Sequence, residues 1–181
     1  MSKILQRGGF ENSNKKKVLV LYEFFFPGFK AGGPIQSLVN LVNSLSEKLT
    51  FWVSTTAFDL TATQPYDSIK TNTWTYNKIG NNEKPIQIWY SSKKKPGFFK
   101  LYKSIKTAEC DIIFINGLYT QYFIFPLIYK KFGWLNKTKI ILSPRGMLQQ
   151  GSLQIKSRKK QIFITLVKSL GLLNGVDYHA T

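Results

Sequence analysis

The residues best suited to chemistry are glycines that follow the first strongly apolar run of the chain. Gly32 and Gly33 precede Pro34 in the segment Phe26–Pro34, where a helix is predicted to begin. Glycine lets the backbone approach a ligand closely, and the amides at a helix N-terminus favour a phosphate. Lys30 adds a positive charge. The pattern predicts phosphate binding, and a glycine-rich turn that serves packing alone is the alternative.

Two further segments follow predicted strands and carry polar side chains. Arg145 lies in Ser143–Leu148, and a guanidinium at a strand end can bind a phosphate or carboxylate through two hydrogen bonds. Asn116 and Tyr119 lie in the other segment, where the asparagine amide can orient a substrate hydroxyl. The alternatives are an arginine that ties loops together and an asparagine that caps the next helix.

Basic residues form two clusters from residue 93 onward. Basic side chains beside aromatic ones suit an anionic membrane surface, and they also suit nucleic acid through phosphate contact and stacking. A solvated surface is the alternative for either cluster alone. The residues of this predicted anion patch are Lys93, Lys94, Lys95, Phe98, Phe99, Lys156, Arg158, Lys159 and Lys160.

Other reactive groups are scarce. The chain has one cysteine, Cys110, and one histidine, His179, which exclude an internal disulfide and a cysteine- or histidine-based metal cluster. Glu23 follows the first apolar run and is placed to reach the ligand side of the fold. The sequence contains neither the dinucleotide-binding glycine fingerprint nor a P-loop, and it displays no complete active site.

Short apolar runs alternate with helical patterns, and these elements must position the polar segments. Strands are predicted at residues 17–22, 51–56, 86–90, 111–116, 139–143 and 177–180, and helices at 35–45, 98–105, 120–132 and 155–170. The apolar side of the last helix comprises Ile155, Ile162, Phe163, Leu166, Val167 and Leu170. Residues 59–85 are predicted to be an irregular insertion. The alternation predicts an α/β fold, a doubly wound, mostly parallel, Rossmann-like sheet flanked by helices, whose ligands bind beyond the carboxyl ends of the strands.

Composition adds bounds to this picture. The chain has 181 residues, of which 43% are hydrophobic, and a formal net charge of +17 at pH 7. These values predict one folded domain at residues 16–181 after a basic N-terminal arm at residues 1–15, and a partner that carries phosphates. No signal peptide is recognisable, and no apolar run approaches the ~18–20 residues that span a bilayer, so we expect a cytoplasmic protein.

Taken together, the motifs resemble the N-terminal, acceptor-side half of a family 4 glycosyltransferase, a retaining enzyme of the GT-B type. The resemblance covers residues 16–181. Its carriers are Phe26–Pro34, Asp111–Leu118, Ser143–Leu148, Leu153–Lys160 and Tyr178–Thr181. It implies one half of a GT-B fold, in which two Rossmann-like domains face a cleft. The nucleotide-sugar domain, with its acidic E-x7-E motif, is absent from this sequence, so we expect a fragment or a truncated form.

The resemblance also implies roles for individual residues. The positions matched to the donor phosphate or sugar are Gly32, Gly33 and Arg145, and those matched to the acceptor are Lys30, Asn116 and Tyr119. Many relatives carry a His-x-His-Gly pattern where this chain has Phe114–Gly117. Asn116 is therefore the candidate polar aid to catalysis. A nucleotide-sugar is implied as co-substrate, with no cofactor and no metal.

The expected function is transfer of a sugar, with retention, from a nucleotide-sugar to a glycan or lipid-linked acceptor. The expected partners are donor, acceptor, the missing domain and the anionic inner face of the plasma membrane, where the protein would be peripheral. The isolated chain is expected to be inactive. One alternative is a basic nucleic-acid-binding module, which explains the charge but leaves the glycine and Pro-Arg-Gly segments without a role. The other is a non-catalytic glycosyltransferase remnant.

Overall fold

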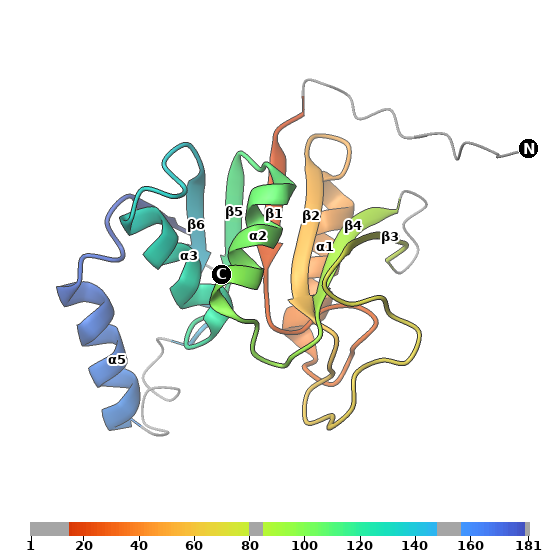
Figure 1. Cartoon of the computed structure of the whole chain (residues 1–181), viewed down its shortest axis with the longest axis horizontal. Helices are drawn as coiled ribbons and strands as arrows, with labels where there is room; N and C mark the ends of the chain where they lie inside the picture. The colour runs from red at the N-terminus through yellow and green to blue at the C-terminus, as the bar shows by residue number, and fades with distance from the viewer. Residues whose placement is uncertain (1–14, 80–84, 148–156, 180–181) are drawn as a thin grey trace, which may run out of the picture.

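The computed structural model describes residues 15–79, 85–147 and 157–179. Within them, seven strands form one sheet that is flanked by four helices (Figure 1). Some predictions fall outside the described residues: those for residues 1–14 of the basic arm, for residues 80–84 of the insertion, for residues 148–156, which include Ile155 and Lys156, and for residues 180–181.

Each strand and helix predicted from the sequence is present. The strands are β1 (Lys17–Leu21), β2 (Thr50–Thr56), β3 (Trp74–Asn77), β4 (Ile86–Ser91), β5 (Ile112–Asn116), β6 (Lys139–Ser143) and β7 (Val176–Tyr178). The helices are α1 (Gly33–Leu45), α2 (Phe98–Ala108), α3 (Gln121–Lys131) and α5 (Ser157–Ser169). Strand β3 is the addition that the sequence analysis did not predict.

The sheet has the order β3-β4-β2-β1-β5-β6-β7, and every neighbouring pair is parallel except β3 with β4. When the edge strand β3 is set aside, this is the 3-2-1-4-5-6 order of the doubly wound fold. The predicted α/β fold class is therefore confirmed. The order reverses between β1 and β5, which makes that pair the topological switch point of the sheet.

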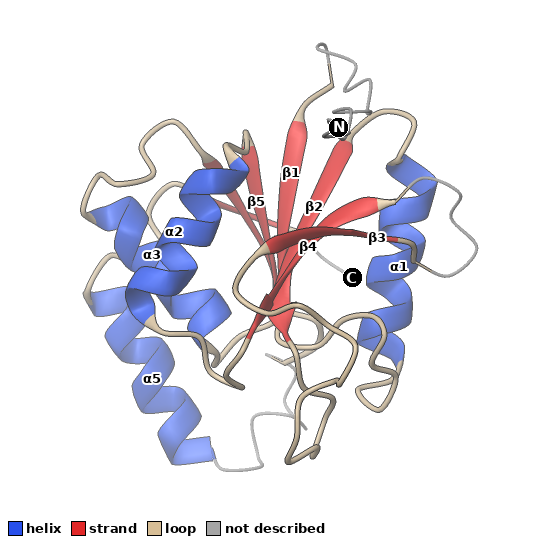
Figure 2. Cartoon of the chain, turned by 45° about the vertical axis from the view of Figure 1, so that its right-hand side comes forward, coloured by secondary structure: helices blue, strands red, loops and turns tan. Residues whose placement is uncertain are grey.

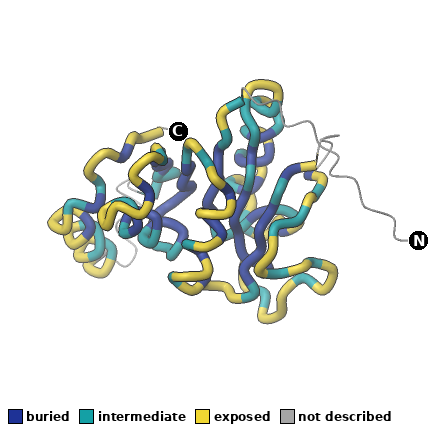
Figure 3. The backbone as a smooth tube through the Cα atoms, turned by 45° about the horizontal axis from the view of Figure 1, so that its top comes forward, coloured by how far each residue is buried: buried dark blue, intermediate teal, exposed yellow. Residues whose placement is uncertain are grey.

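Helices cover the two faces of the sheet unequally. Figure 2 shows α2, α3 and α5 on one face and α1 on the other. The central strand β1 is buried along Val18–Leu21, because side chains on both of its faces enter a core. Leu19 and Leu21 belong to the core under α2 and α3, whereas Val18 and Val20 belong to the core under α1. Figure 3 shows these strands as the buried centre of the molecule.

The interpretation of residues 59–85 as wholly irregular is wrong at β3. Trp74 lies opposite Trp89 of β4, and its ring centroid is 4.7 Å from that of Trp52. The strand has four residues, none of which is fully buried. A short, half-exposed edge strand lacks the apolar alternation by which strands are recognised in a sequence.

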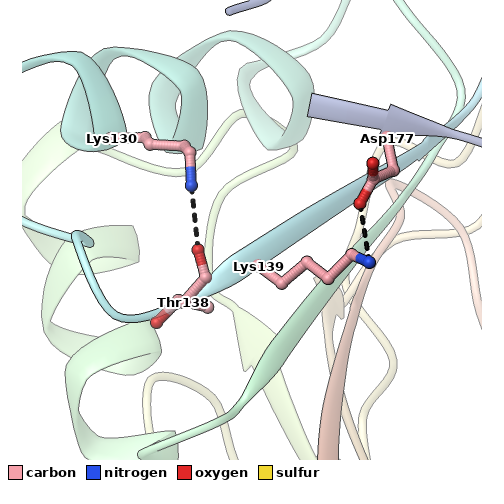
Figure 4. Close-up of polar contacts among 4 residues, drawn as sticks. All are labelled: Lys130, Thr138, Lys139 and Asp177. Atoms are coloured by element: carbon pink, nitrogen blue, oxygen red, sulfur yellow. Dashed lines mark hydrogen bonds and ion pairs between the residues drawn. The ribbon is translucent and has the colours of Figure 1, made fainter. Parts of the chain in front are cut away.

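The other edge of the sheet is tied by polar contacts (Figure 4). Lys139 of β6 pairs with Asp177 of β7 at 2.9 Å, with both side chains more than half exposed. Lys130 at the end of α3 donates a hydrogen bond of 3.1 Å to the carbonyl oxygen of Thr138. Exposed ion pairs stabilise a fold weakly, so these contacts chiefly fix the position of β7 and of the α3–β6 connection.

Candidate functional site

The candidate site lies where the order of the sheet reverses. The connection after β1 leads to α1 on one face, whereas the connection after β5 leads to α3 on the other (Figure 2). In open α/β sheets, ligands bind where such connections diverge, beyond the carboxyl ends of the two strands. Tyr22 and Glu23 follow β1, Gly117 follows β5, and Arg145 follows β6.

Two of the predicted site residues meet in this region. The Arg145 Nε donates a 2.5 Å hydrogen bond to the Asn116 Oδ1. Asn116 is 3% exposed, and its Nδ2 has no hydrogen-bond partner among the described residues. An unpaired buried amide costs free energy and is uncommon in a folded domain, so this amide is a candidate for a functional role. Arg145 therefore has both of the roles considered for it: it ties two loops together, and it lies just beyond a strand end.

The loops after β5 and β6 hold each other in uncommon backbone conformations. Gly117 has φ 106°, Tyr119 φ 65° and Arg145 φ 52°, all in the region that L side chains rarely adopt. The Gly117 N–H donates to the carbonyl oxygen of Ser143 at 2.8 Å, and the Leu118 N–H lies 3.3 Å from the Met147 Sδ. At the non-glycine residues Tyr119 and Arg145 such conformations cost about 1–3 kcal/mol each, and conformations of this kind cluster at ligand sites.

Electrostatic interactions link the ends of β1 and β6. Burial raises the pKa of the Tyr22 phenol; the Glu23 carboxylate raises it further, and the Arg145 guanidinium lowers it. Burial also raises the pKa of Glu23, against the effect of Lys95. Burial lowers the pKa of Arg145, and Tyr22 opposes that shift. A carboxyl group, a phenol and a guanidinium thus share one partly buried region.

Asp59 anchors the glycine segment. This residue is 7% exposed, and its carboxylate accepts hydrogen bonds of 3.3 Å from the N–H groups of Phe29 and Lys30. A third bond, of 2.7 Å, comes from the N–H of Leu60. The amides of Phe29 and Lys30 are therefore occupied by the protein itself. The Lys30 side chain is exposed.

The three glycines of this segment have different reasons to be glycine. A Cβ on Gly28 would lie 2.4 Å from the Tyr66 hydroxyl, so Gly28 serves close packing. Gly32 has φ 67°, which favours glycine. Gly33 has neither constraint, since no atom lies within 4 Å of the position that its Cβ would take. Its N–H also has no acceptor in the described part of the chain, and it lies at the first turn of α1.

A groove runs beside this turn. Its volume is about 640 Å³, and Gly32 contributes to its lining. The α1 side chains Gln36 and Asn40 also line it, and they hydrogen-bond to each other at 3.0 Å. Phe29, which is 75% exposed, lines the groove as well. An exposed aromatic ring beside amide groups offers both apolar and hydrogen-bonding contacts to a polar ligand.

The remaining predicted residues are dispersed. The Tyr119 hydroxyl is buried with no described partner, and its ring lies 5.7 Å from the Lys160 Nζ. Phe98 packs with Tyr129 in an aromatic cluster under α2, whereas Phe99 is 73% exposed. Exposed side chains in the β4–α2 loop and at the start of α5 are Lys93, Lys94, Lys95, Arg158 and Lys159. The structure thus joins Asn116 with Arg145, while the described residues of the predicted anion patch lie in the β4–α2 loop, in α2 and at the start of α5.

Sequence reasoning did not identify Tyr22 and Asp59. Tyr22 ends the first apolar run, so the sequence pattern predicted a core residue there and not a site residue. Asp59 follows β2 much as Glu23 follows β1. Its position shortly after a strand was the one signal that could have identified Asp59. The signal was weak because Asp59 also begins a long polar segment.

Within residues 15–79, 85–147 and 157–179, no three His, Cys, Asp or Glu side chains come together in a way that could hold a metal ion. No helix in the same ranges is long and apolar enough to cross a bilayer. Comparison of the chain with models of protein families, with curated proteins and with solved structures found no match.

Proposed function

We propose that this chain is the acceptor-side domain of a retaining glycosyltransferase, which acts together with a nucleotide-sugar domain on a glycan or lipid-linked acceptor. The observation that carries the proposal is the Asn116–Arg145 pair beside the switch point of a doubly wound sheet. It puts a guanidinium and an unpaired amide N–H where this class of fold binds phosphorylated ligands.

The chemistry of sugar transfer suits these groups. The bond between the anomeric carbon and the diphosphate breaks, and a bond to the acceptor hydroxyl forms. Negative charge then develops on the departing diphosphate. Arg145 stabilises that charge, and the N–H of Gly33, aided by the dipole of α1, supplies a second donor.

The acceptor would occupy the groove beside Gly32. Asn116 orients a hydroxyl of either substrate through its unpaired amide, and Glu23 is the nearby group able to accept a hydroxyl proton. The proposed reaction needs no metal, because Arg145 and backbone amides stabilise the leaving group.

Titration of the ¹⁵N-labelled chain with nucleoside diphosphate sugars tests this function by NMR. We expect shifts at the Gly33 amide and the Asn116 side-chain amide. Arg145→Gln should weaken binding by about tenfold or more, the effect of losing a charged hydrogen bond. Lys137→Gln, an exposed cation before β6, is the matched control and should bind as the wild type does.

Two results would contradict the proposal. One is equal binding by the wild type and by Arg145→Gln. The other is a response of the same amides to an oligonucleotide at physiological salt without any response to nucleotide-sugars. That second result would favour the nucleic-acid-binding alternative, which the net charge of +17 supports.

A further inference from the structure

Helix α5 exposes side chains that belong to its predicted apolar side. Ile162 is 61% exposed, Leu166 53% and Leu170 54%. These residues recur every four positions and form one stripe along α5 and the residue that follows it. Of the predicted apolar side, Val167 is buried, at 3% exposed, and Phe163 is half-buried. The predicted apolar side is therefore covered only in part, since Ile162, Leu166 and Leu170 stay exposed.

The reason lies in how α5 packs. Phe163 contacts the rings of Tyr119 and Phe123, with centroids 5.5 Å and 6.0 Å away, and Val167 enters the core beside it. This narrow seam attaches the helix to the domain. The stripe of Ile162, Leu166 and Leu170 is on the neighbouring side of the helix, outside the seam.

Positive charge accompanies the stripe. The exposed side chains of Arg158 and Lys159 precede Ile162 by four and three residues, which places them on the same side of the helix. No acidic residue occurs anywhere between Asp111 and Asp177 in the sequence. The same interval contains ten basic residues: Lys130, Lys131, Lys137, Lys139, Arg145, Lys156, Arg158, Lys159, Lys160 and Lys168.

We propose that the stripe and its flanking cations dock α5 onto the surface of an anionic lipid bilayer. Aliphatic side chains beside lysine and arginine suit the boundary between acyl chains and negative headgroups. A second copy of the chain would bring the same positive charge to the interface, which disfavours self-association. Nucleic acid would pair with the cations but would leave Ile162, Leu166 and Leu170 in water.

The topology relates this surface to the candidate site. Because β6 and β7 are parallel, α5 between them begins at the edge where the strands end. Figure 1 shows α5 beginning at the edge toward which β1 points. Docking through the first turns of α5 would bring the loops at the switch point toward the lipid surface. The docking itself is independent of the proposed sugar transfer.

Flotation with vesicles tests the proposal. The chain is mixed with phosphatidylcholine vesicles that either contain or lack phosphatidylglycerol. We expect it to float with the anionic vesicles, and to bind neutral ones at least tenfold more weakly. The triple variant Ile162→Ser, Leu166→Ser, Leu170→Ser should lose at least tenfold in binding. The double variant Arg158→Gln, Lys159→Gln should lose binding and some of its salt dependence.

Phe132→Ser provides the matched control, since Phe132 is 68% exposed just beyond α3. This control should float as the wild type does. Urea unfolding of every variant shows whether the fold is intact, and substitutions at these exposed positions should leave the unfolding midpoint close to that of the wild type.

Three outcomes would overturn the proposal. The first is equal flotation with neutral and anionic vesicles. The second is anionic flotation that the folded triple variant retains. The third is absence of flotation together with self-association, or with oligonucleotide retention at about 0.15 M salt, either of which would assign α5 to a different partner.

Discussion

Helices α1 and α5 have the same length, 13 residues each, but they differ in charge and in how far their apolar side chains are buried. The segment of α1 contains no charged residue. Its apolar side chains Ile35, Leu38, Val39 and Val42 are buried, and Leu41 and Leu45 are partly buried. In α5, Val167 is the buried apolar residue, while Ile162 and Leu166 are exposed beside basic side chains. An apolar repeat therefore shows that a helix has an apolar side, but not which part of that side the fold covers.

The position of each helix in the sheet explains the difference. Helix α1 packs over the central strand β1, and its core includes Val20 and Val53 from neighbouring strands. Helix α5 connects β6 with β7, the last strand of the sheet, so it lies at an edge rather than over the centre. In α5, the side of the helix with Phe163 and Val167 packs on the domain. The neighbouring side, with Ile162 and Leu166, stays available for another contact.

The largest expected effect is a difference in how much the same kind of substitution in α1 and in α5 lowers the free energy of unfolding. Leu38 is fully buried in α1, so Leu38→Ala should lower the free energy of unfolding by about 2–5 kcal/mol. Leu166→Ala should change it by less than about 0.5 kcal/mol, because that side chain is more than half exposed. Urea unfolding monitored by circular dichroism measures both. Equal losses would mean that α5 is packed as fully as α1.

The sequence was most informative where burial is continuous. The run at Lys17–Leu21 predicted the central strand, because a parallel strand inside a sheet is apolar on both faces. Strand β3 escaped prediction because none of its residues is fully buried. The exposed stripe of α5 escaped for a related reason: periodicity reports the character of side chains, whereas coverage depends on elements that are distant in sequence.

The candidate site was predictable in its parts but not in its assembly. Asn116 and Arg145 each stood out because they follow predicted strands. Their hydrogen bond joins residues 29 positions apart, and it depends on the pairing of Asn116 with Ser143 across β5 and β6. No local pattern encodes that register, and none shows that Asp59 occupies the amides of Phe29 and Lys30.

The next largest effect concerns the anchor at the entrance to α1. Asp59→Asn removes a carboxylate that accepts three backbone N–H groups, so it should lower the free energy of unfolding by about 1.5–3 kcal/mol. Asp67→Asn is the control, since Asp67 is exposed in the same loop. An unfolding free energy for Asp59→Asn that equals the control value would show that the glycine segment holds its shape without this anchor.

A smaller effect distinguishes the two glycines at the start of α1. Gly32→Ala should cost about 1–2 kcal/mol, because its φ of 67° disfavours any side chain. Gly33→Ala should instead stabilise the chain by about 0.4–1 kcal/mol, since its surroundings are open. The same Gly33 variant should weaken nucleotide-sugar binding in the NMR titration. Unchanged binding by Gly33→Ala would mean that this glycine serves no ligand.

The smallest expected effect is a difference in pH dependence between the two halves of the molecule. The half that contains α5 has no carboxyl side chain between Asp111 and Asp177, whereas Glu23 borders the α1 half. Burial raises the pKa of Glu23 above its ordinary value of 4.5, so its ionisation costs stability as pH rises through the raised value. Glu23→Gln removes that cost.

The variant should be more stable than the wild type at pH 7, and the gain should vanish below pH 4.5, where Glu23 is protonated in both folded and unfolded states. Urea unfolding across this range measures the gain, and a gain that stays constant with pH would place Glu23 in water rather than in the partly buried site.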